Sequence, residues 1–237
     1  MRAENLERHA ASTVNINHPY YIQYHFLFKD LKDAVSKYAK GDLLDIGCGN
    51  KPYAPYFDGL LNSYVGCDIV QSDRNLVDII CPATDIPLPN ESKDTVFSTQ
   101  VIEHVADHQA LLNEAYRILK PGGHVIVSGP MAWEHHEEPY DFFRFTKYGF
   151  EYIFEKAGFT DVEIIPNGGK WDMIGQLFHN AFRSSFKDKK SFGARLMDGI
   201  YFLFRLKWII NLFFVWLDNV DKDYSVTSNF VVVAKKA

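Results

Sequence analysis

The segment Leu43-Leu44-Asp45-Ile46-Gly47-Cys48-Gly49 decides the fold of this chain. Its first four residues form a short and mostly apolar run, which is typical of a buried parallel strand. A glycine turn follows, and the missing side chains of Gly47 and Gly49 let a ligand approach the backbone. Asp68 ends the next apolar run, where a carboxylate can accept hydrogen bonds from a ribose diol. The segment therefore predicts an α/β unit that binds a ribose-containing ligand.

The composition fits one α/β domain with an appendage. The chain has 237 residues, of which 47% are hydrophobic and 23% charged, which is enough for a packed core. The net charge of -5 argues against a general nucleic-acid binder, because such a protein needs a basic face. Cys48, Cys67 and Cys81 lack metal-binding spacing and indicate buried thiols in a reducing compartment. We expect a cytoplasmic protein with no nucleic-acid partner, and the polar N-terminus predicts no signal peptide.

Apolar runs and helical patterns alternate along the middle of the chain, which is typical of a doubly wound parallel sheet. After the first strand, further strands are expected at 64–68, 76–80, 95–98, 124–128 and 229–234, with a helix at 107–119. The expected organisation is an N-terminal helical cap (1–40), a core (41–166 and 226–237) and an aromatic and basic helical insertion (167–225) before the last strand.

Five motifs resemble the class I S-adenosylmethionine (SAM)-dependent methyltransferases, in particular their type 11 group. They occur in this order: 44–49, Asp68, 85–89, 101–105 and 117–123. The resemblance implies a Rossmann-like sheet of seven strands whose last strand is antiparallel, and SAM as the cofactor. It implies these cofactor-binding residues: Asp45, Gly47, Cys48, Gly49, Asp68, Ile69, Asp85, Ile86 and Gln100.

The resemblance also assigns contacts within that set. Asp45 would face the amino end of SAM, and Asp68 would bind the ribose hydroxyls. Asp85 would meet the adenine amino group with Ile86 beside the ring, and Gln100 would line the methionine side. Since SAM carries a sulfonium and an α-amino group but no phosphate, a site rich in carboxylates suits it.

The loop 129–146 is the expected acceptor site, because ligands of open α/β sheets bind beyond the carboxyl ends of the strands. It concentrates two histidines, four acids, one arginine and five aromatic residues. The expected catalytic residues are His135, His136 and Asp141, and the expected substrate-binding residues are Trp133, Glu137, Tyr140 and Arg144. A hydroxyl acceptor would benefit from a base among them. Asp141 and Arg144 are equally compatible with a structural ion pair.

The run 137–146, followed by Ala157-Gly158-Phe159, resembles methyltransferases of bacterial surface-polysaccharide clusters. This resemblance implies O-methylation of a sugar or cell-surface glycan precursor, with a small-molecule or lipid-linked glycan as substrate. The acceptor, the methylated atom, the need for a base and the oligomeric state stay open.

No metal site is expected. Some methyltransferases of related fold bind a divalent ion through Glu-x-x-Glu-His and a later histidine. Here Gln100 replaces the first carboxylate ahead of Glu103 and His104, and His104 is expected to pack at a sheet–helix junction.

The segment 183–217 is aromatic and locally basic, with seven basic and two acidic side chains between 183 and 207. Arg205, Lys207 and Asn211 interrupt its apolar part and argue against a membrane span. The pattern fits an interfacial helix at the inner face of an anionic membrane, where a lipid-linked acceptor would be held. A helix packed on the domain or on a second subunit is the alternative.

Two other functions stay open. A nicotinamide-dependent dehydrogenase would need a third glycine where Pro52 stands, although Tyr152 and Lys156 have the spacing of a short-chain dehydrogenase pair. The alternative outside the enzymes is a SAM-binding or membrane-docking module without catalysis, against which the acids at the cofactor positions argue.

Overall fold

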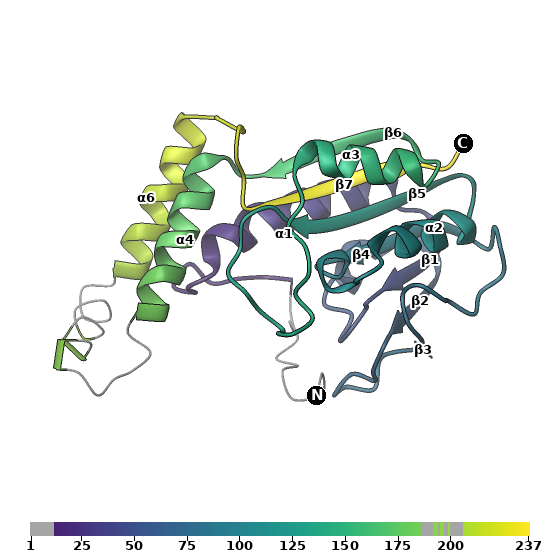
Figure 1. Ribbon diagram of the computed structural model, residues 1–237, viewed down its shortest axis with the longest axis horizontal. Coiled ribbons are helices and arrows are strands. Elements are labelled where there is room, and N and C mark those ends of the chain that lie inside the picture. Colours follow the sequence, from purple (N-terminus) through teal and green to yellow (C-terminus); the bar gives the residue numbers. More distant parts are fainter. Residues whose placement is uncertain (1–11, 186–191, 194, 197–198, 200–205) are drawn as a thin grey trace.

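A computed structural model shows a seven-stranded sheet covered by helices on both faces (Figure 1). It describes residues 12–185, 192, 193, 195, 196, 199 and 206–237. The strands are β1 (Gly41–Ile46), β2 (Leu61–Asp68), β3 (Ile79–Ile80), β4 (Lys93–Thr99), β5 (Leu119–Pro130), β6 (Thr160–Asn167) and β7 (Asn229–Lys235). The helices are α1 (Tyr21–Tyr38), α2 (His108–Ile118), α3 (Lys147–Lys156), α4 (Lys170–Ser185) and α6 (Leu206–Val220), with short 3-10 helices η2 (Ala54–Phe57) and η3 (Ile102–His104).

The strand order is β3-β2-β1-β4-β5-β7-β6, and β7 runs antiparallel to both of its neighbours. The pairs β1–β2, β1–β4, β2–β3 and β4–β5 are parallel. The expected Rossmann-like sheet with an antiparallel last strand is therefore confirmed.

Burial on both faces explains why β1 is apolar. Leu44 and Ile46 belong to the core cluster that packs against α2 and α3, whereas Leu43 belongs to the cluster under α1. Alternate side chains of a strand point to opposite faces, so a central strand with both faces covered needs apolar residues at successive positions.

The third strand is shorter than expected, because only Ile79 and Ile80 pair with β2. The residues before Ile79 form local hydrogen bonds with side chains. The Gln71 side chain exchanges two hydrogen bonds with the backbone of Val77, at 2.9 and 3.0 Å. The Asp78 carboxylate accepts the backbone N–H of Gly66 at 2.7 Å. These local bonds compete with strand pairing, and the apolar pattern of 76–80 does not reveal them.

Helices α4 and α6 pack side by side next to the N-terminal end of α1 (Figure 1). Asp218 of α6 accepts the backbone N–H groups of Gly169 and Asp172 at 3.0 Å, which satisfies the first turn of α4. Asn211 is buried and donates to the carbonyl of Ile16 at 2.6 Å. The polar residues that interrupt this apolar helix thus fix its packing.

No helix in the part of the chain that the structure describes is long and apolar enough to cross a membrane. The apolar part of the expected segment 183–217 is described from Leu206 onward as α6. The basic residues Lys187, Lys189, Lys190 and Arg205 lie outside the described residues.

Candidate functional site

A cavity of about 600 Å³ lies at the carboxyl ends of β1, β2 and β4. This is the edge of an open α/β sheet at which ligands bind. One half of the cavity is lined by the glycine turn after β1 and the end of β2, and the other half by the loop after β5. We call the lining residues within 45–53, 67–69 and 81–84 the turn half, and those within 104–107 and 133–142 the loop half.

The turn after β1 needs its glycines. Gly47 has φ +73°, and a Cβ atom there would lie 2.3 Å from the side chain of Val101. The N–H groups of Gly47 and Cys48 both donate to the carbonyl of Cys67, at 2.8 and 3.0 Å, and tie the turn to β2. Gly47, Cys48 and Gly49 all line the cavity as a result.

Asp68 lies at the end of β2 and faces the same half of the cavity. It is buried, and its Oδ2 accepts the N–H of Gly49 at 3.1 Å. The bond holds the carboxylate beside the glycine turn. Ile69 follows with 45% of its surface exposed and adds an apolar wall to the cavity.

Asp45 is a second buried carboxylate in the turn half. Burial raises the pKa of Asp45 to about 7, although the hydrogen bond from Tyr64 at 2.5 Å and the charge of Lys51 act in the opposite direction. A cationic group in the cavity would favour the charged form of this carboxyl.

Asp85 and Ile86, which are expected to contact the adenine, do not line the cavity. Asp85 is exposed, and Ile86 is buried in the core. Helix α2 holds this segment: the N–H of Ile86 donates to Glu114 at 2.9 Å, and its carbonyl accepts from Arg117 at 2.9 Å. The preceding residues 81–84 line the cavity instead. Their position just after β3 is the signal that could have identified them.

Gln100 lies between the two halves of the cavity, with φ +54°. Its side-chain amide donates to Ser128 Oγ and Asn229 Oδ1, both at 2.9 Å. The residue therefore lines the site, as expected, while its amide group is used within the protein.

The loop half contains most of the expected acceptor residues. Trp133, His136, Glu137 and Tyr140 line it, together with Phe142 and His104, which the sequence did not assign to the acceptor site. The ring of Tyr20 lies 5.5 Å from the ring of Trp133, so the N-terminal segment also borders this end.

His135, which the sequence predicts as a catalytic residue, does not line the cavity. Its side chain is 84% exposed and lies 3.6 Å from Glu138. The backbone N–H of His136 donates to Asp141 at 3.2 Å, and this bond fixes the loop so that His136 is the histidine that faces inward. Adjacent histidines cannot be separated by spacing alone.

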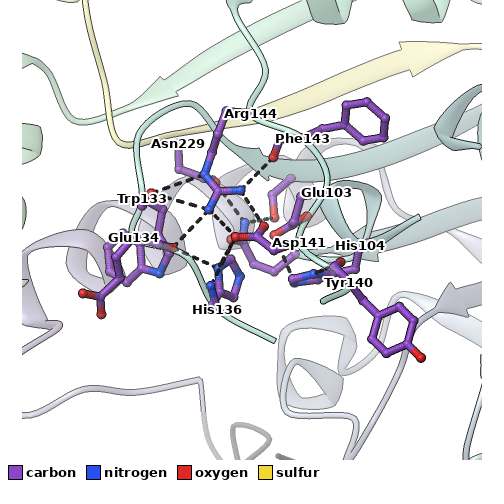
Figure 2. A network of polar contacts seen from close by, with 12 residues as sticks. Glu103, His104, Trp133, Glu134, His136, Tyr140, Asp141, Phe143, Arg144 and Asn229 are labelled. Atoms are coloured by element: carbon purple, nitrogen blue, oxygen red, sulfur yellow. Dashed lines mark hydrogen bonds and ion pairs between the residues drawn. The ribbon is translucent and has the colours of Figure 1, made fainter. Parts of the chain in front are cut away.

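Asp141 and Arg144 form the structural ion pair that the sequence left open (Figure 2). The guanidinium donates to both carboxylate oxygens, at 2.6 and 2.7 Å, and to the carbonyl of Glu134 at 3.0 Å. Burial opposes ionisation, but the hydrogen bonds from Arg144 lower the pKa of Asp141 to about 2. Neither residue lines the cavity. The ion pair occupies both oxygens of the Asp141 carboxylate, which the sequence predicts as a catalytic residue.

Sequence reasoning did not place Glu103 in the site. Its side chain is fully buried, and neither carboxylate oxygen has a hydrogen-bond partner among the described residues. Burial raises the pKa of Glu103 to about 8. The candidate ligand atoms of Glu103, His104 and His136 lie within 4.8 Å of one another. The Glu-His pair of the metal-binding pattern is the sequence signal for two of these residues, whereas His136 comes from the loop after β5 and is not set apart from His135 by spacing.

The exposed pair Tyr152 and Lys156 lies on α3 and does not line the cavity. This placement does not favour a dehydrogenase.

A family model described as a methyltransferase domain matches residues 44–127. A probable SAM-dependent methyltransferase of Mycolicibacterium smegmatis is 34% identical over 97 residues, which cover 38% of this chain and 38% of that protein. The 2-methyl-6-phytyl-1,4-hydroquinone methyltransferase of Spinacia oleracea is 36% identical over 110 residues, which cover 44% of this chain and 29% of that protein. This chain thus matches well under half the length of these relatives.

A solved structure of phosphoethanolamine N-methyltransferase 2 from Haemonchus contortus, in complex with SAM, has a TM-score of 0.53 and 19% identity. The match covers 94% of this chain and 60% of that chain, and it shows the fold. Together these findings confirm the resemblance to class I SAM-dependent methyltransferases. The resemblance to methyltransferases of polysaccharide clusters stays a prediction.

Proposed function

We propose that this protein transfers a methyl group from SAM to an oxygen of a small acceptor held in the loop half of the cavity. The methyltransferase-domain match and the SAM-dependent relative support the cofactor and the reaction class. The observation that carries the proposal is the glycine turn beside two buried carboxylates, Asp45 and Asp68, that line one cavity.

The turn half suits the polar groups of SAM. Asp68 would accept hydrogen bonds from the ribose hydroxyls, as carboxylates at this strand end do for other nucleosides. Asp45 would face the α-amino group, whose positive charge compensates a buried carboxylate. The methionine end would then extend past Gln100 toward the loop half.

Methyl transfer to oxygen is an in-line displacement. The acceptor oxygen forms a bond to the methyl carbon as the carbon–sulfur bond breaks, the bond electrons remain on sulfur, and the hydroxyl proton passes to a base. Alignment and exclusion of water supply much of the acceleration. Trp133, Tyr140 and Phe142 line the loop half as aromatic walls, and His136 is the histidine placed to accept a proton.

A sugar or glycan precursor is the acceptor that we favour. The run 137–146 supports this through its resemblance to methyltransferases of surface-polysaccharide clusters. The cavity combines these aromatic walls with polar groups at Glu137 and His136, which suits a ring that carries hydroxyls.

A peripheral membrane contact would bring such an acceptor to the protein. Helix α6 exposes apolar residues on one side, at helical spacing, and these are Trp208, Ile209, Leu212, Phe213, Trp216 and Val220. The neighbouring segment 183–207 is basic in sequence. An apolar face beside basic residues is typical of a helix that lies in the interface of an anionic membrane.

Methyl-labelled SAM tests this proposal with two acceptor preparations, water-soluble sugar nucleotides and lipid-linked glycan precursors in anionic vesicles. We expect label in the lipid-linked fraction and release of S-adenosylhomocysteine. Label only in the soluble sugars would contradict the membrane part. Absence of label in both, with no binding of S-adenosylhomocysteine at high micromolar concentration, would contradict the methyltransferase itself.

A further inference from the structure

One carboxylate and two imidazoles meet at the loop half of the cavity (Figure 2). Glu103 and His104 come from η3, and His136 comes from the loop after β5. The His104 Nε2 lies 3.9 Å from Glu103 Oε1, and the two imidazole rings are 4.7 Å apart, edge to face. Three potential ligand atoms therefore surround one point beside the cavity.

The outer nitrogen of each imidazole contacts a backbone carbonyl. His104 Nδ1 lies 2.9 Å from the carbonyl of Tyr140, and His136 Nδ1 lies 3.2 Å from the carbonyl of Glu134. Since a carbonyl only accepts, each Nδ1 carries the hydrogen, and each Nε2 presents a lone pair. Metal-binding histidines are held by the same kind of contact.

The Asp141 carboxylate adds a further support to His136. Its Oδ2 lies 3.5 Å from His136 Nδ1, and Arg144 fixes that carboxylate by two hydrogen bonds. A carboxylate behind a ligating histidine sets the ring orientation and increases its basicity. The ion pair of Asp141 and Arg144 does not line the cavity, but it would orient the His136 ring.

Glu103 is a buried carboxyl group that a bound cation would compensate. Its side chain is fully buried, and neither oxygen has a hydrogen-bond partner within the part of the chain that the structure describes. A carboxylate in that position is costly unless a proton or a cation compensates it. The hydrogen bonds of Arg144 go to Asp141 and to backbone carbonyls.

We propose that Glu103, His104 and His136 bind one divalent transition-metal ion. Two imidazole nitrogens with one carboxylate oxygen suit zinc and its first-row neighbours better than magnesium or calcium, which prefer all-oxygen sites. The sequence argued against a metal because Gln100 replaces a carboxylate. The structure removes that objection, because Gln100 uses its amide on Ser128 and Asn229, and His136 supplies the third ligand.

Three protein ligands leave a coordination position for a further group. His104 and His136 line the cavity, so that position would be available to an acceptor oxygen. There the ion would orient the acceptor and stabilise negative charge on its oxygen. With the ion bound, the Nε2 lone pair of His136 is used as a ligand, so the ion would replace His136 as the group that assists loss of the acceptor proton, which would pass to solvent. This role rests on the proposed methyl transfer, whereas metal binding itself does not.

The test uses the full chain after treatment with a chelator, titrated with Zn²⁺ by calorimetry and with Co²⁺ by visible absorption. We expect one ion per chain and cobalt d–d bands typical of nitrogen and oxygen ligation. Glu103→Gln and His136→Gln should each weaken binding by at least about tenfold. His135→Gln is the matched control, because its exposed side chain lies outside the cavity, and it should leave the affinity and the spectrum unchanged.

Binding of S-adenosylhomocysteine to the same variants separates this inference from the proposed function. Equal metal binding by wild type, Glu103→Gln and His136→Gln would overturn the metal site, as would an equal loss in His135→Gln. The site is also overturned if the wild-type protein binds no metal while it binds S-adenosylhomocysteine normally. Metal binding without any S-adenosylhomocysteine binding would instead overturn the proposed function and leave the site intact.

Discussion

The two halves of the cavity are built differently. In the turn half, Gly47 and Cys48 bond to the carbonyl of Cys67, and Asp68 bonds to Gly49, so adjacent parallel strands fix the geometry. In the loop half, the ion pair between Asp141 and Arg144 holds the loop through the carbonyl of Glu134 and the N–H of His136. Backbone bonds add to it, since the N–H groups of Phe142 and Phe143 donate to the carbonyl of Glu103. The cofactor side thus depends on bonds between adjacent strands, and the acceptor side on an ion pair and hydrogen bonds within a loop and to η3.

This difference predicts that the two halves can be damaged separately. A change in the loop should leave cofactor binding intact, and a change at a strand end should leave the loop intact. Such independence would let acceptor preference vary on a constant cofactor site, since loops tolerate change better than the strands they connect.

Arg144→Ala should have the largest effect on stability. It leaves the Asp141 carboxylate, 5% exposed, without its partner, and Arg144 itself is 24% exposed. We expect the free energy of unfolding to fall by about 3 kcal/mol, the lower end for a broken buried pair. Urea unfolding measures this, and affinity for S-adenosylhomocysteine should not change. A parallel loss of that affinity would show that the halves are coupled.

Asp68→Ala should damage the other half. The free energy of S-adenosylhomocysteine binding should weaken by about 1–3 kcal/mol, the range for a polar ligand group left without its partner. Asp85→Ala is the control, because Asp85 is exposed and outside the cavity, and it should bind as wild type does. Calorimetry of both variants measures the affinity for S-adenosylhomocysteine. A larger loss of affinity in Asp85→Ala would contradict our placement of the cofactor.

The carboxyl of Asp45 should make cofactor binding depend on pH. Burial raises its pKa to about 7, so the folded protein favours the protonated form. Its contribution to stability is therefore complete below its unfolded pKa and is lost as pH rises through 7. A ligand ammonium favours the charged form, so affinity should rise about tenfold between about pH 6 and pH 8.

Asp45→Asn isolates this effect, because it removes the titrating group and keeps the size of the side chain. The ratio of wild-type to variant affinity for S-adenosylhomocysteine should rise across that pH interval. A constant ratio would place the ligand ammonium away from Asp45.

His135→Ala should have the smallest effect. Its side chain is 84% exposed, so we expect a change in unfolding free energy within about 0.5 kcal/mol and no change in methyl transfer. His136→Ala should lower the transfer rate while S-adenosylhomocysteine affinity stays the same. Steady-state kinetics compare the methyl-transfer rates of the two variants. A larger loss of rate in His135→Ala than in His136→Ala would contradict the loop conformation.

The sequence identified the turn half well because its signals are local. A strand that runs into Gly47 and Gly49, with an acid at the end of the next strand, allows one geometry. The position of Asp85 outside the cavity could not be predicted, because it depends on Arg117 and Glu114 of α2, which hydrogen-bond the backbone of Ile86.

For the loop half, the sequence predicted which segment forms it but not which side chains in that segment face the cavity. Spacing located the loop 129–146 at the correct edge of the sheet but could not decide between His135 and His136. It also could not show that Glu103 meets a histidine from a separate loop. Both facts depend on tertiary hydrogen bonds, which leave no periodic pattern in the sequence.

A crystal structure of the complex with S-adenosylhomocysteine tests the central claim most directly. The account predicts the ribose hydroxyls within hydrogen-bond distance of Asp68, the amino group beside Asp45 and the sulfur directed toward His136. A nucleoside bound in the loop half, or a ribose without contact to Asp68, would contradict the division of the cavity.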